Sequence, residues 1–363
     1  MKSRFATSSV VAALVLSTSG LSGQAVVPRA LGRPTHTPGA EFSVVSWVVE
    51  LRPGQLLVGD AENQQIATLD LATGTSRPIA RTGAGPREYR TVSEYVLPRH
   101  EGGAFVIDFA QRRLLPVHAD GSVGDAVGYP ARLMLQQRDS SGRLYGEVMR
   151  FSAARELSDS ISVVRWDPKA ERIDTLLTFD ANRSDMVSAG GPMRVWGPTA
   201  RWFVLGDGRL VVIGSAPYQV RSWQSGRWSA PVAFPWPNRA PSNVEIAAKR
   251  AELEAQPVRG MGTGGGAAPK RPERAFPSKL PAFEAFSDTP IRAAPDGTFW
   301  IPRLDPSSSA QHYDIVDLTR VRGQVTLPKG SAVVGFGAGG VYVSETDRDD
   351  IVRIRRYAMP TWP

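Results

Sequence analysis

The stretch Gly54-Gln55-Leu56-Leu57-Val58-Gly59-Asp60 decides the fold, because it recurs along the chain in recognisable form. Each copy is a glycine-led, mostly apolar run, which is typical of a buried β-strand that follows a tight turn. Several copies carry a further turn residue directly before the glycine, as Asp207 and Asp296 do. The other copies begin at Gly103, Gly142, Gly208, Gly297 and Gly340. Six copies predict six repeated structural units.

The first unit holds four strand-length segments, at residues 44–49, 54–60, 65–70 and 75–81. Four short strands separated by turn signals fit one antiparallel sheet. One such sheet cannot bury both of its faces, but sheets stacked around an axis can. The sequence therefore predicts an all-β fold, a six-bladed β-propeller of four-stranded antiparallel blades. An open sandwich or two stacked barrels is the alternative architecture.

The sixth unit runs out of chain after Tyr357. We therefore expect the N-terminal part of the mature chain to supply the missing strand and close the ring. Three repeats end their glycine-led strand on a carboxylate, at Asp60, Asp108 and Glu345. A carboxylate in this position can accept backbone N–H groups across a tight turn. In a propeller these turns share a face with the connections between blades, so the carboxylates should surround one mouth of the central channel.

Composition limits the function classes. The chain of 363 residues has no cysteine, which excludes disulfides, thiolate catalysis and Cys-ligated zinc. Its 42% hydrophobic residues can fill a packed core and exclude global disorder. The net charge is +8, but acidic residues are spread among the arginines and no Lys/Arg run with interleaved aromatics occurs. We therefore expect a solvated mixed-charge surface and no nucleic-acid partner.

The N-terminus reads as a targeting segment. Lys2 and Arg4 precede an apolar stretch at residues 5–16, and small residues follow as far as Ala25. This is the pattern of a secretory signal peptide, predicted at residues 1–25, and it is too short for a membrane span. No other stretch is apolar for long enough to cross a bilayer. The expectation is an exported monomer, periplasmic or extracellular, with the propeller at residues 26–363.

One insertion interrupts the repeats, at about residues 235–280. Within it, Ser242-x-x-Glu245 is a capping box and residues 244–255 are rich in helix formers. Residues 260–266 then read as a flexible glycine-rich linker. A helix with a glycine-rich segment on one face is either a lid over a site or a cover for a blade edge.

The connection after the first unit carries a second signature. Residues 83–90 read G-x-G-P-x-E-Y-R. With this motif and the turn Asp60-x-x-Asn63-x-Gln65-Ile66, the chain resembles six-bladed β-propellers of the NHL-repeat type. It is similar to an uncharacterised exported bacterial branch with G-x-G-P-x-E-[FY]-R after its first blade, although Gln65 replaces the usual Arg of the turn. Such propellers include binding scaffolds, lactonases and lyases, so the resemblance implies a fold and does not select a function.

The candidate site lies at the channel mouth. Arg87 and Arg90 could bind a carboxylate or phosphate through paired hydrogen bonds, and Tyr89 could stack on a ligand. The alternative interpretation is structural: Glu88 and Arg90 pair with each other or with nearby turns, and Tyr89 wedges between blades. The predicted ligand-binding residues are Arg87, Glu88, Tyr89, Arg90, Asp108, Arg150 and Arg303.

Cofactor signals are sparse. The four histidines are scattered without ligand-like spacing, so no metal site is predicted. Calcium is the one cofactor left open, through the carboxylates of successive blades, Asp60, Asp108, Glu147 and Glu345. No G-x-S-x-G nucleophile motif occurs.

Two functional hypotheses result. The preferred one is a non-catalytic exported propeller that binds a small ligand or an exported protein, because no coherent catalytic set emerges. The alternative is a metal-dependent hydrolase or lyase, lactonase-like, with its site at the channel mouth.

Overall fold

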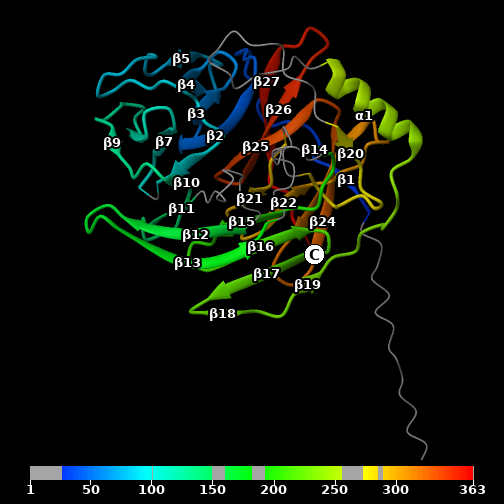
Figure 1. Cartoon of the computed structure of the whole chain (residues 1–363). Helices are drawn as coiled ribbons and strands as arrows, with labels where there is room; N and C mark the ends of the chain where they lie inside the picture. The colour runs from blue at the N-terminus through cyan, green and yellow to red at the C-terminus, as the bar shows by residue number, and fades with distance from the viewer. Residues whose placement is uncertain are drawn as a thin grey trace, which may run out of the picture.

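The computed structural model describes residues 27–99, 101–148, 160–181, 193–255, 273–284 and 289–362. In these ranges the chain is almost entirely β-structure, and its sheets form a ring of six blades (Figure 1). The predicted six-bladed propeller is therefore confirmed. Within the described part of the chain, no helix has both the length and the apolar character needed to cross a membrane.

In blades 1 to 3, hydrogen-bonded neighbours follow one another in sequence. Blade 1 holds β2 (Val45–Arg52), β3 (Gln55–Asp60), β4 (Gln65–Asp70) and β5 (Ser76–Pro78). Blade 2 holds β6 (Val96–Pro98), β7 (Ala104–Asp108), β8 (Arg113–Val117) and β9 (Val127–Gly128). Blade 3 holds β10 (Leu133–Arg138), β11 (Leu144–Val148), β12 (Ser160–Asp167) and β13 (Arg172–Asp180).

The later blades vary this plan. Blade 4 holds β15 (Ala200–Val204), β16 (Leu210–Ser215) and β17 (Tyr218–Gln224), with β18 (Arg227–Trp228) and β19 (Val232–Ala233) both pairing with β17. Blade 5 holds β21 (Arg292–Ala293), β22 (Phe299–Pro302), β23 (Ala310–Val316) and β24 (Val321–Pro328). Blade 6 holds β25 (Ser331–Gly337), β26 (Gly340–Thr346) and β27 (Val352–Ala358).

The six glycine-led repeats form the second strands of the six blades: β3, β7, β11, β16, β22 and β26. The glycine is needed where the first strand turns into the second. Gly208 and Gly297, for example, have φ of +84° and +82°, in the left-handed region that side-chain-bearing residues disfavour. The repeat therefore marks a backbone requirement at the same turn of the blade.

The second strands bury both of their faces between neighbouring blades. In β3, Leu56 and Val58 pack in the cluster shared with blade 6, whereas Leu57 packs in the cluster shared with blade 2. All three side chains are 0% exposed, and each such burial contributes about 1.5–3 kcal/mol. Corresponding apolar clusters fill the other blade interfaces. Burial on both sides explains why these runs are continuously apolar instead of alternating.

The N-terminal segment closes the ring, as the sequence predicts. Phe42 and Val352 exchange two backbone hydrogen bonds of 2.9 and 3.0 Å, and the Arg356 N–H donates to the His36 carbonyl at 3.1 Å. The segment thus lies antiparallel beside β27 as the outer edge of blade 6. Upstream of it, β1 (Arg29–Ala30) pairs in parallel with β24 and adds a fifth strand to blade 5.

The insertion contains the predicted helix, α1 (Asn243–Ala255). Its capping box is formed: the Ser242 N–H donates to Glu245 at 2.7 Å, and the Glu245 N–H donates to the Ser242 hydroxyl at 3.2 Å. Ile246 and Leu253 pack the helix against a small cluster that includes Trp196. Next to it, β20 (Arg274–Ala275) pairs in parallel with β14 (Met193–Arg194). The predicted signal peptide and glycine-rich linker lie outside the described residues.

Candidate functional site

The loop at residues 83–90 joins blade 1 to blade 2 and folds around the Glu88 carboxylate. This carboxylate accepts the Gly85 N–H at 2.7 Å and also pairs with Arg81. Both interactions lower the pKa of Glu88. A Cβ atom at Gly83 would lie 2.0 Å from a Glu88 carboxylate oxygen, so a side chain cannot fit there without displacing Glu88. The G-x-G and the glutamate of the motif are therefore parts of one packed turn.

Tyr89 is 1% exposed and lies between blades 1 and 2. Its hydroxyl donates to the Gln64 carbonyl at 2.9 Å and accepts the Ile66 N–H at 3.0 Å. Burial raises the pKa of this phenol. From blade 2, the Arg113 guanidinium donates to the carbonyls of Gly85 and Glu88, each at 2.9 Å. The loop is thus fastened to both blades. Tyr89 lies between them, as the structural alternative to a ligand-binding role predicts.

The two predicted arginines of the loop point outward. Arg87 pairs with Asp125 at 2.8 Å, and both side chains are exposed. Arg90 is exposed, and its backbone N–H donates to Asp108 at 2.9 Å. Asp108, 1% exposed, also accepts the Gln111 N–H at 3.2 Å. The structure therefore brings Arg90 and Asp108 together on one face.

Arg303 lies at a different place, in a second cavity of about 390 Å³ beside α1. Its guanidinium is 5.0 Å from the centre of the Trp236 ring and 3.6 Å from a carboxylate oxygen of Asp314. Burial raises the pKa of Asp314. No contact of the described residues joins Arg303 to residues 83–90. Arg150 lies outside the described residues, so its role stays a prediction.

The carboxylates considered for calcium already accept hydrogen bonds from the protein. Asp60 accepts the Ser43 and Val44 N–H groups at 3.0 and 3.1 Å. Glu147 accepts the Trp202 indole N–H at 2.6 Å. Glu345 accepts the Tyr357 hydroxyl at 2.5 Å. Over the described ranges, no three Asp, Glu or His side chains gather as metal ligands.

Glu345 does not cap the turn after its strand, although the repeat pattern predicts that it does. The turn after β26 is capped by Asp347, which accepts the Asp349 and Ile351 N–H groups at 2.9 and 3.1 Å. The strand β26 continues to Thr346, so the turn begins later than the repeat spacing predicts. In blades 1 and 2 the expected pattern holds, because Asp60 and Asp108 accept the N–H groups of Asn63 and Gln111.

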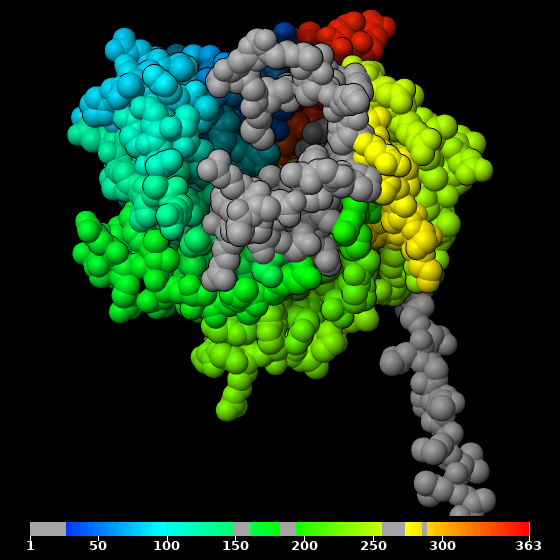
Figure 2. Space-filling view, in the orientation of Figure 1, coloured from blue at the N-terminus to red at the C-terminus, as the bar shows by residue number. Residues whose placement is uncertain are grey.

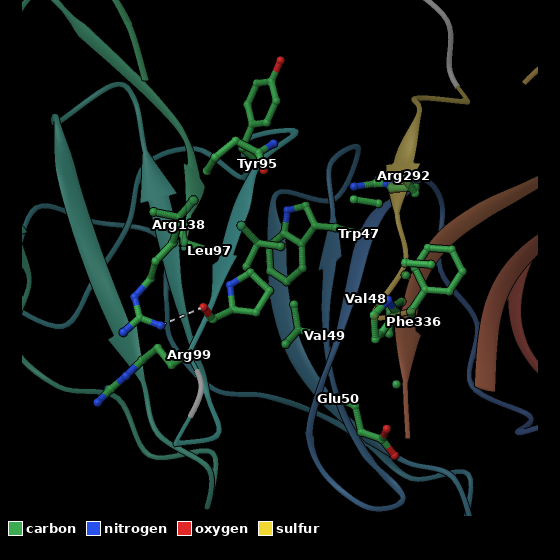
Figure 3. A pocket seen from close by; sticks show the side chains of 18 of the residues that line it. Trp47, Val48, Val49, Glu50, Tyr95, Leu97, Arg99, Arg138, Arg292 and Phe336 are labelled. Atoms are coloured by element: carbon green, nitrogen blue, oxygen red, sulfur yellow. Dashed lines mark hydrogen bonds between the residues drawn. The ribbon is translucent and has the colours of Figure 1, made fainter. Parts of the chain in front are cut away.

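A cavity of about 630 Å³ occupies the central channel. It is lined by the first strands of all six blades and by the turns that follow them (Figure 3). Figure 2 shows the molecule hollowed at its centre. None of the predicted site residues that the structure describes lines this cavity. A concave cavity of this size is the usual form of a small-molecule site.

The chemistry of this channel centres on Arg292 of β21. Its guanidinium reaches past blade 6 and donates to the Ser46 carbonyl of blade 1, while its Nε atom is buried without a hydrogen-bond partner in the described structure. Glu94 lines the same cavity and is exposed. Tyr95 and Phe336 contribute half-buried aromatic rings.

Two further arginines lie toward the turn end of the channel. Arg99 and Arg138 share the Glu101 carboxylate at 2.6 and 3.9 Å. Arg138 also donates to the Pro98 carbonyl at 3.3 Å, the bond drawn in Figure 3. These charges are thus partly balanced within the protein, in contrast to Arg292.

Sequence reasoning missed Arg292 because its strand, β21, is only two residues long and gives no strand-like pattern in the sequence. A usable signal was present nonetheless. The first strand of each blade directly precedes the glycine-led repeat, so residues before each glycine are candidates for the channel wall. Arg292 lies five positions before Gly297.

The comparisons with known proteins agree with the fold. A candidate exported protein from Bacteroides fragilis is 13% identical over 89% of this chain and 92% of its own, with a TM-score of 0.52. A Bacteroides vulgatus protein from a family of unassigned function is 10% identical over 90% and 96%, with a TM-score of 0.47. A gluconolactonase from Xanthomonas campestris is 11% identical over 91% and 94%, with a TM-score of 0.43.

No protein-family model matches the chain, and no curated protein matches it either. At identities this low, structural similarity establishes the fold alone. The six-bladed β-propeller is shown by the chain's own sheets, and its function has to be argued from its own residues.

Proposed function

We propose that this chain is an exported, NHL-type propeller that binds a small ligand in its central channel without transforming it. The observation that supports the proposal is the cavity of about 630 Å³, walled by all six blades and containing both charged and aromatic side chains. A binding site needs such a wall of apolar surface with a few polar groups that set orientation. Export rests on the signal-like residues 1–25, and the NHL assignment rests on the turn and loop motifs.

The predicted residues on the rim belong to the same proposal. Arg90 has an exposed guanidinium without an ion pair in the described structure, so it is available to a ligand or to an exported partner protein at this face. Arg87 is exposed as well but already pairs with Asp125. Glu88, Tyr89 and Asp108 support the rim by holding the loop in place.

The metal-dependent hydrolase or lyase has weaker support. The carboxylates it would rely on, Asp60 and Asp108, are buried and accept backbone N–H groups. A cation would have to replace these bonds. Metal analysis of the purified protein, with thermal melts in calcium, zinc and EDTA, tests this alternative. Stoichiometric metal together with a rise in Tm would revive it, because a ligand that binds only the folded state stabilises that state.

The binding proposal is tested by small-molecule capture. The mature protein is equilibrated with a metabolite extract, separated from unbound compounds and analysed by mass spectrometry. The test variant is Ala293→Trp, which adds bulk to an exposed lining position of the channel. The control is Val244→Trp, at a 78% exposed position on α1.

We expect at least one compound to be retained by the wild type and by the control but not by Ala293→Trp. No retained compound, or equal retention by Ala293→Trp, would overturn a channel site. If no compound is retained, a second capture with the exported protein fraction tests the partner-binding form of the hypothesis, which retention of a protein would favour.

A further inference from the structure

Arg292 is placed where a ligand in the channel would meet it. It belongs to the first strand of blade 5, lines the central cavity and donates to the Ser46 carbonyl of blade 1. A side chain that joins blade 5 to blade 1 reaches past blade 6, so it extends along the wall of the channel. Figure 3 shows Arg292 beside Phe336 on one side of the cavity and Tyr95 on the other, with Trp47 between them.

The Arg292 charge lacks a carboxylate partner among the described residues. A guanidinium has five N–H donors and stays protonated in proteins. The structure assigns one acceptor to it, the Ser46 carbonyl, and leaves the buried Nε without one. Burial also lowers the pKa of Arg292, which reflects its lost hydration. Arg292 as a whole is half-buried, so its charge is only partly desolvated, and an anion bound in the cavity would supply the missing ion pair.

The neighbouring charge sets the character of that anion. Glu94 lines the same cavity, forms no ion pair with Arg292 and is the nearby carboxylate that acts on its titration. The cavity lining holds four arginines (Arg52, Arg99, Arg138 and Arg292) and three carboxylates (Glu50, Glu94 and Asp139), so its net positive charge is small. A doubly charged phosphate would be repelled by Glu94, whereas a single carboxylate can bind the guanidinium through two parallel hydrogen bonds.

The rest of the wall favours an apolar body. Tyr95 and Phe336 are half-buried residues of the cavity lining. The Phe336 ring is fixed by an edge contact with Trp300, at 5.5 Å between ring centres. Rigid aromatic rings beside an anion-binding arginine suit a flat or apolar ligand with one acidic end.

We infer that the channel ligand is an aromatic or apolar monocarboxylate whose carboxylate binds Arg292. The inference rests on the proposed binding function and specifies the class of its ligand. It assigns the recognition of charge to Arg292 and the packing of the ligand body to Tyr95 and Phe336.

The experiment uses matched pairs of probes on the full mature protein. Benzoate, phenylacetate and indole-3-acetate are compared with their carboxamides, and phenyl phosphate serves as the dianion. Melting temperature and titration calorimetry are measured for the wild type, Arg292→Met and Arg292→Lys. Arg348→Gln is the matched control, because its side chain is 94% exposed on an outer turn.

We expect at least one carboxylate to raise the Tm and to bind at least about tenfold more tightly than its carboxamide. Arg292→Met should lose this preference, Arg292→Lys should keep part of it, and Arg348→Gln should keep all of it. Without ligand, the Tm of Arg292→Met should stay close to that of the wild type, because removal of an unpaired charge offsets the loss of the hydrogen bond to the Ser46 carbonyl.

Each of the contrary outcomes overturns the inference. Carboxamides that bind as well as the acids would agree with the binding function but would show that the ligand does not need a negative charge. A preference that survives in Arg292→Met would place the anion elsewhere, and tighter binding of phenyl phosphate would exclude a monocarboxylate. A clear fall in the Tm of ligand-free Arg292→Met would assign Arg292 to the fold. If no probe binds the wild type, the inference fails, and the capture experiment decides the binding function separately.

Discussion

The Tyr89 hydroxyl accepts a hydrogen bond from the Ile66 backbone N–H at 3.0 Å, across the interface of blades 1 and 2. Ile66 is 0% exposed, so its backbone N–H has no access to water. A side chain of the connecting loop therefore completes the hydrogen bonding of the preceding blade. The loop at residues 83–90 acts as a fastener between two repeats in addition to connecting them.

Tyr89→Phe tests this fastening. The change leaves the Ile66 N–H and the Gln64 carbonyl without their partner, which should lower the free energy of unfolding by about 1–3 kcal/mol. Tyr129→Phe is the matched control, because the Tyr129 hydroxyl is buried without a hydrogen-bond partner. Its removal should be neutral or stabilising. Urea denaturation of both variants measures the difference, and equal stabilities would contradict the role given to Tyr89.

Gly83→Ala tests the packing of the motif. The added Cβ would meet the Glu88 carboxylate at 2.0 Å, so the turn should be destabilised by about 1–3 kcal/mol. Gly39→Ala is the control, since a Cβ there meets nothing within 4 Å. The double variant Gly83→Ala/Glu88→Ala removes the obstructing group and should recover part of the lost stability. No recovery would mean that the clash with Glu88 is not the cause.

Asp108→Asn separates a structural role from a binding role. The amide keeps one acceptor oxygen but turns an NH₂ group toward a backbone N–H, so unfolding should become easier by about 1–3 kcal/mol. Affinity for a channel ligand should not change, because Asp108 lies outside the cavity lining. Asp125→Asn, in the exposed pair with Arg87, should cost less than about 0.5 kcal/mol. If a stable Asp108→Asn protein lost affinity for the channel ligand, Asp108 would have to contribute to ligand binding.

Acid should weaken the docking of α1 through Glu245. Hydrogen bonds from Arg239 lower the pKa of Glu245 from 4.5 to about 2. The folded-state pKa is depressed, so this stability is fully present above pH 4.5 and is lost as the pH falls toward about 2. Glu245→Gln should remove that part of the acid dependence and lower stability at neutral pH.

Thermal melts between pH 7 and pH 2 compare this variant with Glu252→Gln on the same helix. Glu252 is 54% exposed and pairs with Lys249, so its replacement should leave the pH profile close to that of the wild type. Parallel pH profiles of the wild type and Glu245→Gln would show that the pair with Arg239 contributes nothing.

The fold was predictable where local backbone chemistry repeats. The turn before each second strand requires a glycine, and this turn recurs in every blade. The capping box predicts the start of α1 from four residues alone. The candidate site was harder to predict from the sequence, because the channel wall exists only when six distant strands meet. Arg292 and Tyr95 are far apart in the sequence and share one cavity only after ring closure.

The sequence also did not show in which direction the side chains of the loop at residues 83–90 point. The motif joins two arginines, a glutamate and a tyrosine, a set that suggests recognition of a ligand. The structure turns Glu88 onto the glycines and Tyr89 into the core, and leaves Arg87 and Arg90 outside. Which groups point inward depended on contacts with Gln64 and Arg113 of the two neighbouring blades.

The closure of blade 6 has a consequence for the order of synthesis. Thr35 is bonded to Arg356, 321 positions later, so blade 6 cannot be completed before the ribosome has made Arg356. Blades 1 to 5 can assemble from neighbouring segments, but the ring must wait for the final strands. Bringing such distant ends together costs on the order of 5 kcal/mol of loop-closure entropy, less whatever the intermediate blades have already recovered. A growing chain therefore exposes an unfinished seam in the ring until the residues of β27 have been made.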